Sequence, residues 1–184
     1  SWTFLIQLIQ VIKNADADME LNYPMVSRVE GVGPMQYGTK GLLGPNFTDI
    51  EEKYDLILCF MDTLNYIVDE KNIKASFKNV YNALNDGGIF LFDIHQLDNF
   101  DNFDGYLETG YIEDVEYVWH SDGQDYDKNI IHHDFRFVDK DNELKERHVQ
   151  RILALKEYKK IYDKLFKDES MHMDDYRIYI KLVK

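Results

Sequence analysis

The sequence predicts an α/β fold in which two buried parallel strands are joined by a helix. Three observations support it: a short apolar run at residues 54–60, a stretch with helical spacing after Asp69, and a second apolar run at residues 89–94. Short, nearly continuous apolar runs are typical of strands buried on both faces. Two such strands joined through a helix form a right-handed βαβ unit, so we expect the strands to be parallel.

The segment before this unit has no comparable pattern. Residues 1–13 contain WTFLIQLIQVI, which predicts an amphipathic helix, and residues 14–52 predict mostly loop. The apolar stretch is too short, and too often interrupted by Gln, to span a bilayer. It lacks a basic leader and a small-residue cleavage site, so we do not expect a signal peptide.

The segment between the two apolar runs has the pattern of an amphipathic helix. Asp69 is a suitable N-cap, because its carboxylate can accept hydrogen bonds from free N–H groups of the first turn. Gly87 and Gly88 would supply the left-handed residues that end a helix. The apolar residues between these points form one stripe at helical spacing: Ile73, Phe77, Val80, Tyr81 and Leu84.

The second half of the chain predicts an antiparallel meander, then a helix and a last strand. Residues 97–111 are acidic, aromatic and rich in turn formers, and we expect a loop over the end of the sheet. Residues 155–166 predict a helix, and the alternation in residues 177–183 predicts an antiparallel strand at the edge of the main sheet. The turns SDGQDYDK and DKDN have hairpin composition. They separate three strand-like runs, at residues 113–120, 129–138 and 144–153.

Composition narrows the classes of protein. A chain of 184 residues is long enough for one domain with a sizeable core. Its net charge of −13 disfavours nucleic acid as a partner, because a polyanion needs a basic surface. The single cysteine, Cys59, excludes an internal disulfide framework and suits a reducing compartment. We therefore expect a cytoplasmic monomer or homodimer with no membrane partner.

The central segments also carry a family resemblance. YDLILCFMDTLNYIVDE, followed by FKNVYNALNDGGIFLFDIH, resembles the fourth strand, the following helix and the fifth strand of class I S-adenosylmethionine-dependent methyltransferases, in a bacterial small-molecule branch. The resemblance covers residues 53–184. It implies a Rossmann-like, mostly parallel sheet with an antiparallel last strand, and an antiparallel cap at residues 112–153. It also implies S-adenosylmethionine as cofactor and methyl transfer to a small molecule (EC 2.1.1.-).

The N-terminal part departs from this family. Members carry an acidic, glycine-rich loop of the form D-x-G-x-G-x-G after their first strand, and residues 1–52 contain no recognisable copy. The GVG at residues 31–33 lacks the strand–turn–helix context of a nucleotide loop. We treat residues 1–184 as one methyltransferase-like domain whose first 52 residues are divergent or incomplete. Two alternatives remain open: a degenerate, non-catalytic binding module, and a nicotinamide oxidoreductase, which would need an equally absent GxGxxG motif.

Polar residues follow both predicted core strands, where ligands bind in open α/β sheets. The resemblance implies that the turn after the first strand lines the cofactor. It also places Asn65 and Tyr66 below the substrate opening, facing a ligand. Asp93 and His95 follow the second strand, and a carboxylate there could orient or deprotonate an acceptor. Capping of a turn by Asp62 and burial of Tyr66 and Asp93 are the structural alternatives. The four cofactor-contacting candidates are Cys59, Phe60, Met61 and Asp62.

The meander adds three candidate substrate-binding residues, Trp119, His148 and Arg151. Trp119 shares a strand face with Tyr117, and the two could form an aromatic wall for a substrate or simply pack in the core. We predict no metal site, because adjacent histidines on a strand point to opposite faces and no metal-ligand spacing occurs. Catalytic residues cannot be assigned from the pattern alone.

Overall fold

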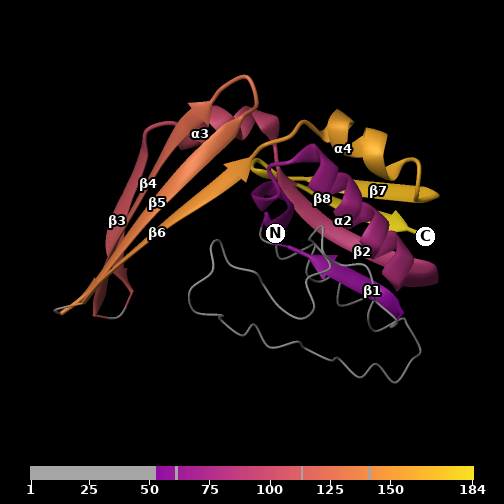
Figure 1. Ribbon diagram of the computed structural model, residues 1–184, viewed down its shortest axis with the longest axis horizontal. Helices are drawn as coiled ribbons and strands as arrows, with labels where there is room; N and C mark the ends of the chain where they lie inside the picture. The colour runs from indigo at the N-terminus through magenta and orange to yellow at the C-terminus, as the bar shows by residue number, and fades with distance from the viewer. Residues whose placement is uncertain (1–52, 61, 113, 141) are drawn as a thin grey trace.

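The computed structural model describes residues 53–60, 62–112, 114–140 and 142–184, which form two β-sheets with flanking helices (Figure 1). The helix predicted at residues 1–13 and the loop predicted at 14–52 lie outside these residues, and so does Met61. No helix within the described ranges is long and apolar enough to cross a membrane.

The first sheet has the strand order β1-β2-β8-β7. β1 (Tyr54–Cys59) pairs in parallel with β2 (Leu84–His95), which confirms the predicted βαβ unit. β8 (Arg177–Val183) is antiparallel to β2, as predicted, and β7 (Asp168–Met173) is antiparallel to β8. Within the described residues this sheet is therefore mixed, with one parallel pair.

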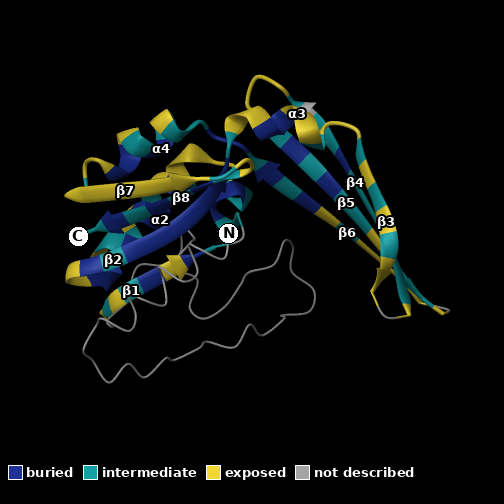
Figure 2. Ribbon diagram, turned by 180° about the vertical axis from the view of Figure 1, so that it is seen from behind, coloured by how far each residue is buried: buried dark blue, intermediate teal, exposed yellow. Residues whose placement is uncertain are grey.

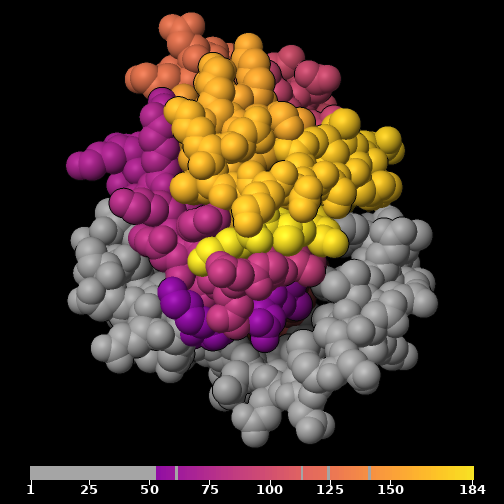
Figure 3. Space-filling model, turned by 90° about the vertical axis from the view of Figure 1, so that its right-hand side faces the viewer, coloured from indigo at the N-terminus to yellow at the C-terminus, as the bar shows by residue number. Residues whose placement is uncertain are grey.

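The prediction that residues 177–183 form an edge strand is wrong. β8 lies between β2 and β7, and Figure 3 shows this C-terminal segment between the magenta α2–β2 region and the orange segment around α4. The edge belongs to β7, whose six residues are all exposed. A strand held by backbone bonds to one neighbour needs no apolar alternation, so DESMHM carries no strand signal in the sequence.

The connecting helix α2 (Glu70–Ala83) begins where the sequence predicts. The carboxylate of Asp69 accepts hydrogen bonds from Lys71 N at 2.6 Å and Asn72 N at 3.3 Å. The predicted end is wrong, because the helix stops at Ala83 and the chain is already extended at the next residue. Gly87, with φ 79°, lies inside β2 where its register with β1 is irregular, instead of capping the helix.

The core lies between this sheet and two helices, α2 and α4 (Leu155–Tyr162), and contains the darkest strands of Figure 2. Phe77 is at its centre. Its ring lies 5.8 Å from Phe90, 5.4 Å from Phe92 and 5.9 Å from Tyr162. The helix predicted at residues 155–166 is confirmed over its first two turns.

The second sheet is antiparallel, in the order β3-β4-β5-β6. Its strands are β3 (Tyr106–Ile112), β4 (Val115–Asp125), β5 (Ile130–Asp139) and β6 (Asn142–Arg151). The predicted meander is confirmed and gains β3.

The loop predicted at residues 97–111 is wrong. It contains η3 (Leu97–Asn99), α3 (Phe100–Phe103) and most of β3. Glycine is common in turns, but Gly110 lies inside β3, where it leaves room for a neighbouring side chain. A Cβ at this position would lie 2.8 Å from the ring of Tyr117 on β4.

Candidate functional site

Two carboxylates meet where β1 and β2 end. Asp62 follows β1 and has φ 49° and ψ 24°, a left-handed conformation that is uncommon outside glycine. Its backbone N–H points at Asp93, whose Oδ1 and Oδ2 lie 3.2 and 3.3 Å away. Asp93, near the end of β2, is only 2% exposed. This contact joins the turn after β1 to the end of β2.

Arg177, at the start of β8, bridges the two carboxylates. Its Nη2 donates to Asp62 Oδ1 at 2.8 Å, and its Nη1 donates to Asp93 Oδ2. Arg177 is opposite His95 in the β2–β8 register, so antiparallel pairing places it at the carboxyl end of β2. Arg177 was not among the residues predicted from sequence. Its position depends on strand register, which the alternation in residues 177–183 does not specify.

Burial and neighbouring groups shift the two carboxyl groups in opposite directions. Burial acts to raise the pKa of Asp62, but His95, Arg177 and Gln150 together outweigh it and hold that pKa below its usual value. At Asp93 burial is the largest effect, and it raises the pKa despite the hydrogen bond and charge of Arg177. Asp62 is therefore the carboxylate that stays ionised to lower pH.

His95, the last residue of β2, lies against Asp62. Its Nε2 is 3.3 Å from Asp62 Oδ2, and the side chain is almost fully buried. Its ring packs edge to face against Phe103 at 5.1 Å. Its Nδ1 is buried without a hydrogen-bond partner in the described part of the chain. Asp62 and His95 thus form an acid–base pair with one nitrogen unused.

A chain of hydrogen bonds runs from the second sheet to Asp62. Trp119 Nε1 donates to His133 Nδ1 at 3.2 Å, and since an indole N–H only donates, the proton of the neutral imidazole is on Nε2. That nitrogen lies 3.2 Å from Gln150 Oε1, and Gln150 Nε2 donates to Asp62 Oδ2 at 2.6 Å. Burial lowers the pKa of His133 to about 4, which keeps the ring neutral. Every donor in the chain points toward Asp62.

A second chain of contacts starts in the short helix after β1 and ends on the second sheet. Tyr66, in η2 (Thr63–Tyr66), has its hydroxyl 3.1 Å from His148 Nδ1, and the rings pack edge to face at 5.7 Å. His148 Nε2 lies 3.2 Å from Glu146 Oε2. Tyr66 and His148, both predicted, are therefore brought together at the junction of the two sheets, and Trp119 reaches it through His133. His133 and Gln150 were not predicted as site residues, although Gln150 alternates with His148 on one face of its strand.

Asn65 and Arg151, two further predicted substrate-binding residues, make backbone contacts and do not join the chains of side chains described above. From sequence we expected Asn65 to face a ligand, but its amide is fully buried. It donates to Arg151 O at 2.9 Å and accepts from His95 N at 3.2 Å, so it joins the sheets through their backbones. The Arg151 guanidinium donates to Lys128 O and Val68 O, on the side of β6 away from His148.

The residues predicted to contact the cofactor, 59–62, differ in how accessible their side chains are. Cys59 is buried among core side chains, and burial raises the pKa of its thiol far above the usual value. Phe60 is half-buried, and its carbonyl accepts from Thr63 Oγ1 at 2.6 Å. Met61 lies outside the described residues. Asp62 is therefore the described member of this turn that contacts several polar side chains.

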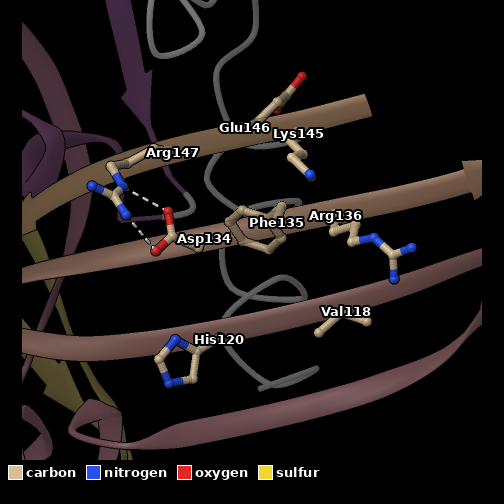
Figure 4. A pocket seen from close by; sticks show the side chains of 8 residues that line it. All are labelled: Val118, His120, Asp134, Phe135, Arg136, Lys145, Glu146 and Arg147. Atoms are coloured by element: carbon tan, nitrogen blue, oxygen red, sulfur yellow. Dashed lines mark hydrogen bonds and ion pairs between the residues drawn. The ribbon is translucent and has the colours of Figure 1, made fainter. Parts of the chain in front are cut away.

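A shallow depression lies on the other face of the second sheet (Figure 4). Its three basic side chains are neutralised by acids: Arg147 donates to Asp134 at 2.6 and 2.8 Å, and Arg136 and Lys145 both pair with Glu143. Because side chains alternate along β5 and β6, these basic side chains lie on the face opposite the one that carries His133 and His148. The polar network at the junction is therefore the better candidate site.

The network can bind and orient a polar ligand and can accept a proton. It offers a carboxylate held ionised, a histidine in contact with it, and half-buried aromatic rings beside them. Among the described residues, no group of three or more His, Cys, Asp or Glu side chains is placed to hold a metal ion.

The described fold is that of S-adenosylmethionine-dependent methyltransferases. A solved structure of such a methyltransferase from Clostridium acetobutylicum superposes with a TM-score of 0.63 and 24% identity, covering 74% of this chain and 60% of that one. A second solved structure, the amino pentose methyltransferase CalS10 from Micromonospora echinaspora, gives a TM-score of 0.57 at 14% identity, covering 73% of this chain and 60% of that one.

Sequence comparison agrees with the fold. GWCH70_2453 of Geobacillus sp. (strain WCH70), a methyltransferase by name, is 26% identical over 133 residues, which are 71% of this chain and 54% of that protein. YqeM of Bacillus subtilis, also a methyltransferase by name, is 27% identical over 120 residues, covering 62% and 48%. The chain spans about half the length of these curated relatives, and no family model matches it. The predicted resemblance to methyltransferases is confirmed.

Proposed function

We propose that this protein transfers a methyl group from S-adenosylmethionine to a small molecule. The observation that carries the proposal is the hydrogen-bonded path from Trp119 through His133 and Gln150 to Asp62. It connects the antiparallel sheet to the carboxyl ends of β1 and β2. In open α/β sheets ligands bind at those ends. An acceptor beside the second sheet would thus be close to a cofactor at the first.

The described residues fit one side of a cofactor site. β1 has a single neighbour, β2, in the described part of the sheet, and the Asp62 turn lies at its carboxyl end. In the resembling fold, further parallel strands adjoin the fourth strand and carry the glycine-rich loop. We propose that such strands adjoin the free edge of β1 and that residues 1–184 belong to one domain, with β3 to β6 as its cap. When bound, the cofactor would supply the electrophilic methyl group.

The chain's own residues would position the acceptor. Methyl transfer is an in-line displacement, so placement of the nucleophile and exclusion of water supply much of the rate. Trp119, Tyr66 and His148 would contact the acceptor body. Asp62 and His95 would take up a proton from an acceptor that arrives protonated. Asn65 and Gln150 would hold the two sheets in register around them.

Two relatives support a small acceptor by what their names say of them. CalS10 is named for an amino pentose, and a Halorhodospira halochloris enzyme that is 29% identical over 75 residues is named glycine/sarcosine N-methyltransferase. Acceptors of this size need only a few side chains to hold them, and Trp119, Tyr66 and His148 would be enough.

Calorimetry of the full chain with S-adenosylhomocysteine tests the cofactor. We expect saturable heat, and at 100-fold excess over Kd a stabilisation of about 2.7 kcal/mol, or roughly 5–10 °C in Tm. Adenosine alone is the matched control and should bind more weakly. The absence of heat at high micromolar S-adenosylhomocysteine would sink the proposal. Binding without methyl transfer to any of a panel of small acceptors would favour the degenerate module.

A further inference from the structure

One row of residues crosses the antiparallel sheet with acids at both ends and aromatic rings between them. Strand register places Glu108 opposite Trp119, Trp119 opposite Phe135, and Phe135 opposite Glu146. Directly paired residues share a face, so all four point to the same side of the sheet. The Trp119 and Phe135 rings are 5.5 Å apart and stacked. All four side chains are half-buried.

This row lies on the inner face, defined as the face of the second sheet that carries His133 and His148. Those histidines form the next row, two residues along each strand, which is roughly 7 Å away. His148 reaches Tyr66, and His133 reaches Asp62 through Gln150. A ligand on the acid–aromatic row would therefore lie one row from the junction with the first sheet.

Charge is segregated between the two faces. The four strands contain four basic residues, Arg136, Lys145, Arg147 and Arg151, and all of them alternate onto the outer face. The inner face keeps Glu108 and Glu146 and, among the residues that the structure describes on these strands, has no Lys or Arg. Its field attracts cations.

Glu108 is held in place as an anion. Tyr117 Oη donates to its Oε1 at 2.6 Å, and Tyr106 Oη donates to its Oε2. These hydrogen bonds hold the pKa of Glu108 below its usual value. An ionised carboxylate has about four acceptor positions, so two hydrogen bonds leave capacity for an ammonium group. The neighbouring rings offer apolar surface for the hydrocarbon part of the same ligand and attract its charge.

We propose that the inner face binds an organic cation through Glu108, Trp119 and Phe135, and that the methyl acceptor is accordingly an amine that arrives as its ammonium form. The assignment of an amine acceptor rests on the proposed function. Binding of an organic cation rests on this row of residues alone. Since an ammonium nitrogen has no lone pair, the acceptor must lose its proton before transfer, and the Asp62–His95 pair next to this face is the group that receives it.

Trp119 provides a direct reporter of this site. The chain has two tryptophans, so Trp2→Phe leaves Trp119 as the single indole emitter. We would titrate that full-length variant with cyclohexylamine, which is an ammonium ion at pH 7.5, and with the neutral isostere cyclohexanol. The expected result is saturable quenching by the amine, with about five-fold weaker binding of the alcohol and a weakening of the amine with added salt.

Two further variants assign the charge. Glu108→Gln keeps the side-chain size and should weaken cyclohexylamine binding about five-fold while leaving cyclohexanol unchanged. Glu116→Gln is the matched control, because it removes a carboxylate from the other face of β4, and it should change neither. Equal binding of amine and alcohol, or equal effects of the two variants, would overturn the proposal. S-adenosylhomocysteine calorimetry on the same preparation separates this failure from failure of the proposed function.

Discussion

Gln150 and Asp62 are 88 residues apart in sequence, yet Gln150 Nε2 donates to Asp62 Oδ2 at 2.6 Å. One residue lies on the antiparallel sheet and the other on the turn after β1. With the buried amide of Asn65, this bond locks the second sheet against the carboxyl ends of the first. The position of the proposed acceptor surface therefore depends on a few polar contacts, and each can be tested.

The first prediction concerns Gln150. Gln150→Met keeps the volume but removes one of the donors to Asp62 and leaves His133 Nε2–H without its acceptor in a buried setting. We expect a loss of about 1–3 kcal/mol in the free energy of unfolding, measured by urea denaturation. Gln96→Met is the control: it removes a single part-buried hydrogen bond, from Gln96 Nε2 to Asp174 O outside the network, so its loss should be smaller than that of Gln150→Met. A loss below about 0.3 kcal/mol would show that the link is dispensable.

The second prediction concerns Asp62. Asp62→Asn would cost little stability if the carboxylate made no structural contacts. The carboxylate, however, accepts from Arg177 and Gln150 and lies against His95. We therefore expect the variant to lose about 1–3 kcal/mol of stability and to bind ligand more weakly. Urea denaturation beside S-adenosylhomocysteine titration measures both, and an unchanged unfolding midpoint would contradict the assigned contacts.

The third prediction concerns Arg177. Removing it leaves two neighbouring carboxylates without a cation, and Arg177→Met should cost about 3–5 kcal/mol. Arg147→Met is the matched control: its pair with Asp134 is exposed and screened by solvent, so the expected loss is much smaller than that of Arg177→Met. Adding Asp93→Asn to Arg177→Met should recover part of the loss. If the double variant is no more stable than the single one, Asp93 is not the uncompensated charge.

The fourth prediction concerns pH. The pKa of His133 is about 4 in the folded protein and about 6.5 when unfolded, so the unfolded state binds the proton more readily. Stability should therefore fall as pH drops from about 6.5 toward 4, by at most about 3 kcal/mol at 1.36 kcal/mol per unit, and should not change through this group above pH 7. Urea denaturation from pH 4.5 to 7.5, compared with His133→Gln, isolates the effect. Parallel pH slopes in the two proteins would contradict it.

The sequence placed candidate residues correctly at one end of the sheet where they lie at or just after the end of a core strand; their role in a site stays a prediction. Asp62 follows β1, Asp93 and His95 are at the end of β2, and the chain direction alone places all three at the carboxyl ends. Arg177, Gln150 and His133 could not be found this way. They reach the site through strand register and through contact between two sheets, and neither is written in local periodicity.

The sequence by itself determined the βαβ unit, the N-cap at Asp69, the meander and the resemblance to methyltransferases, because these depend on hydrophobic period and local backbone chemistry. Only the tertiary structure decided that β7 takes the edge of the sheet, that Asn65 is buried between sheets, and that Glu108, Trp119, Phe135 and Glu146 form one row. The physical reason is that a strand's alternation specifies which residues share a face. Its neighbours, and the offset between them, are set by packing over the whole molecule.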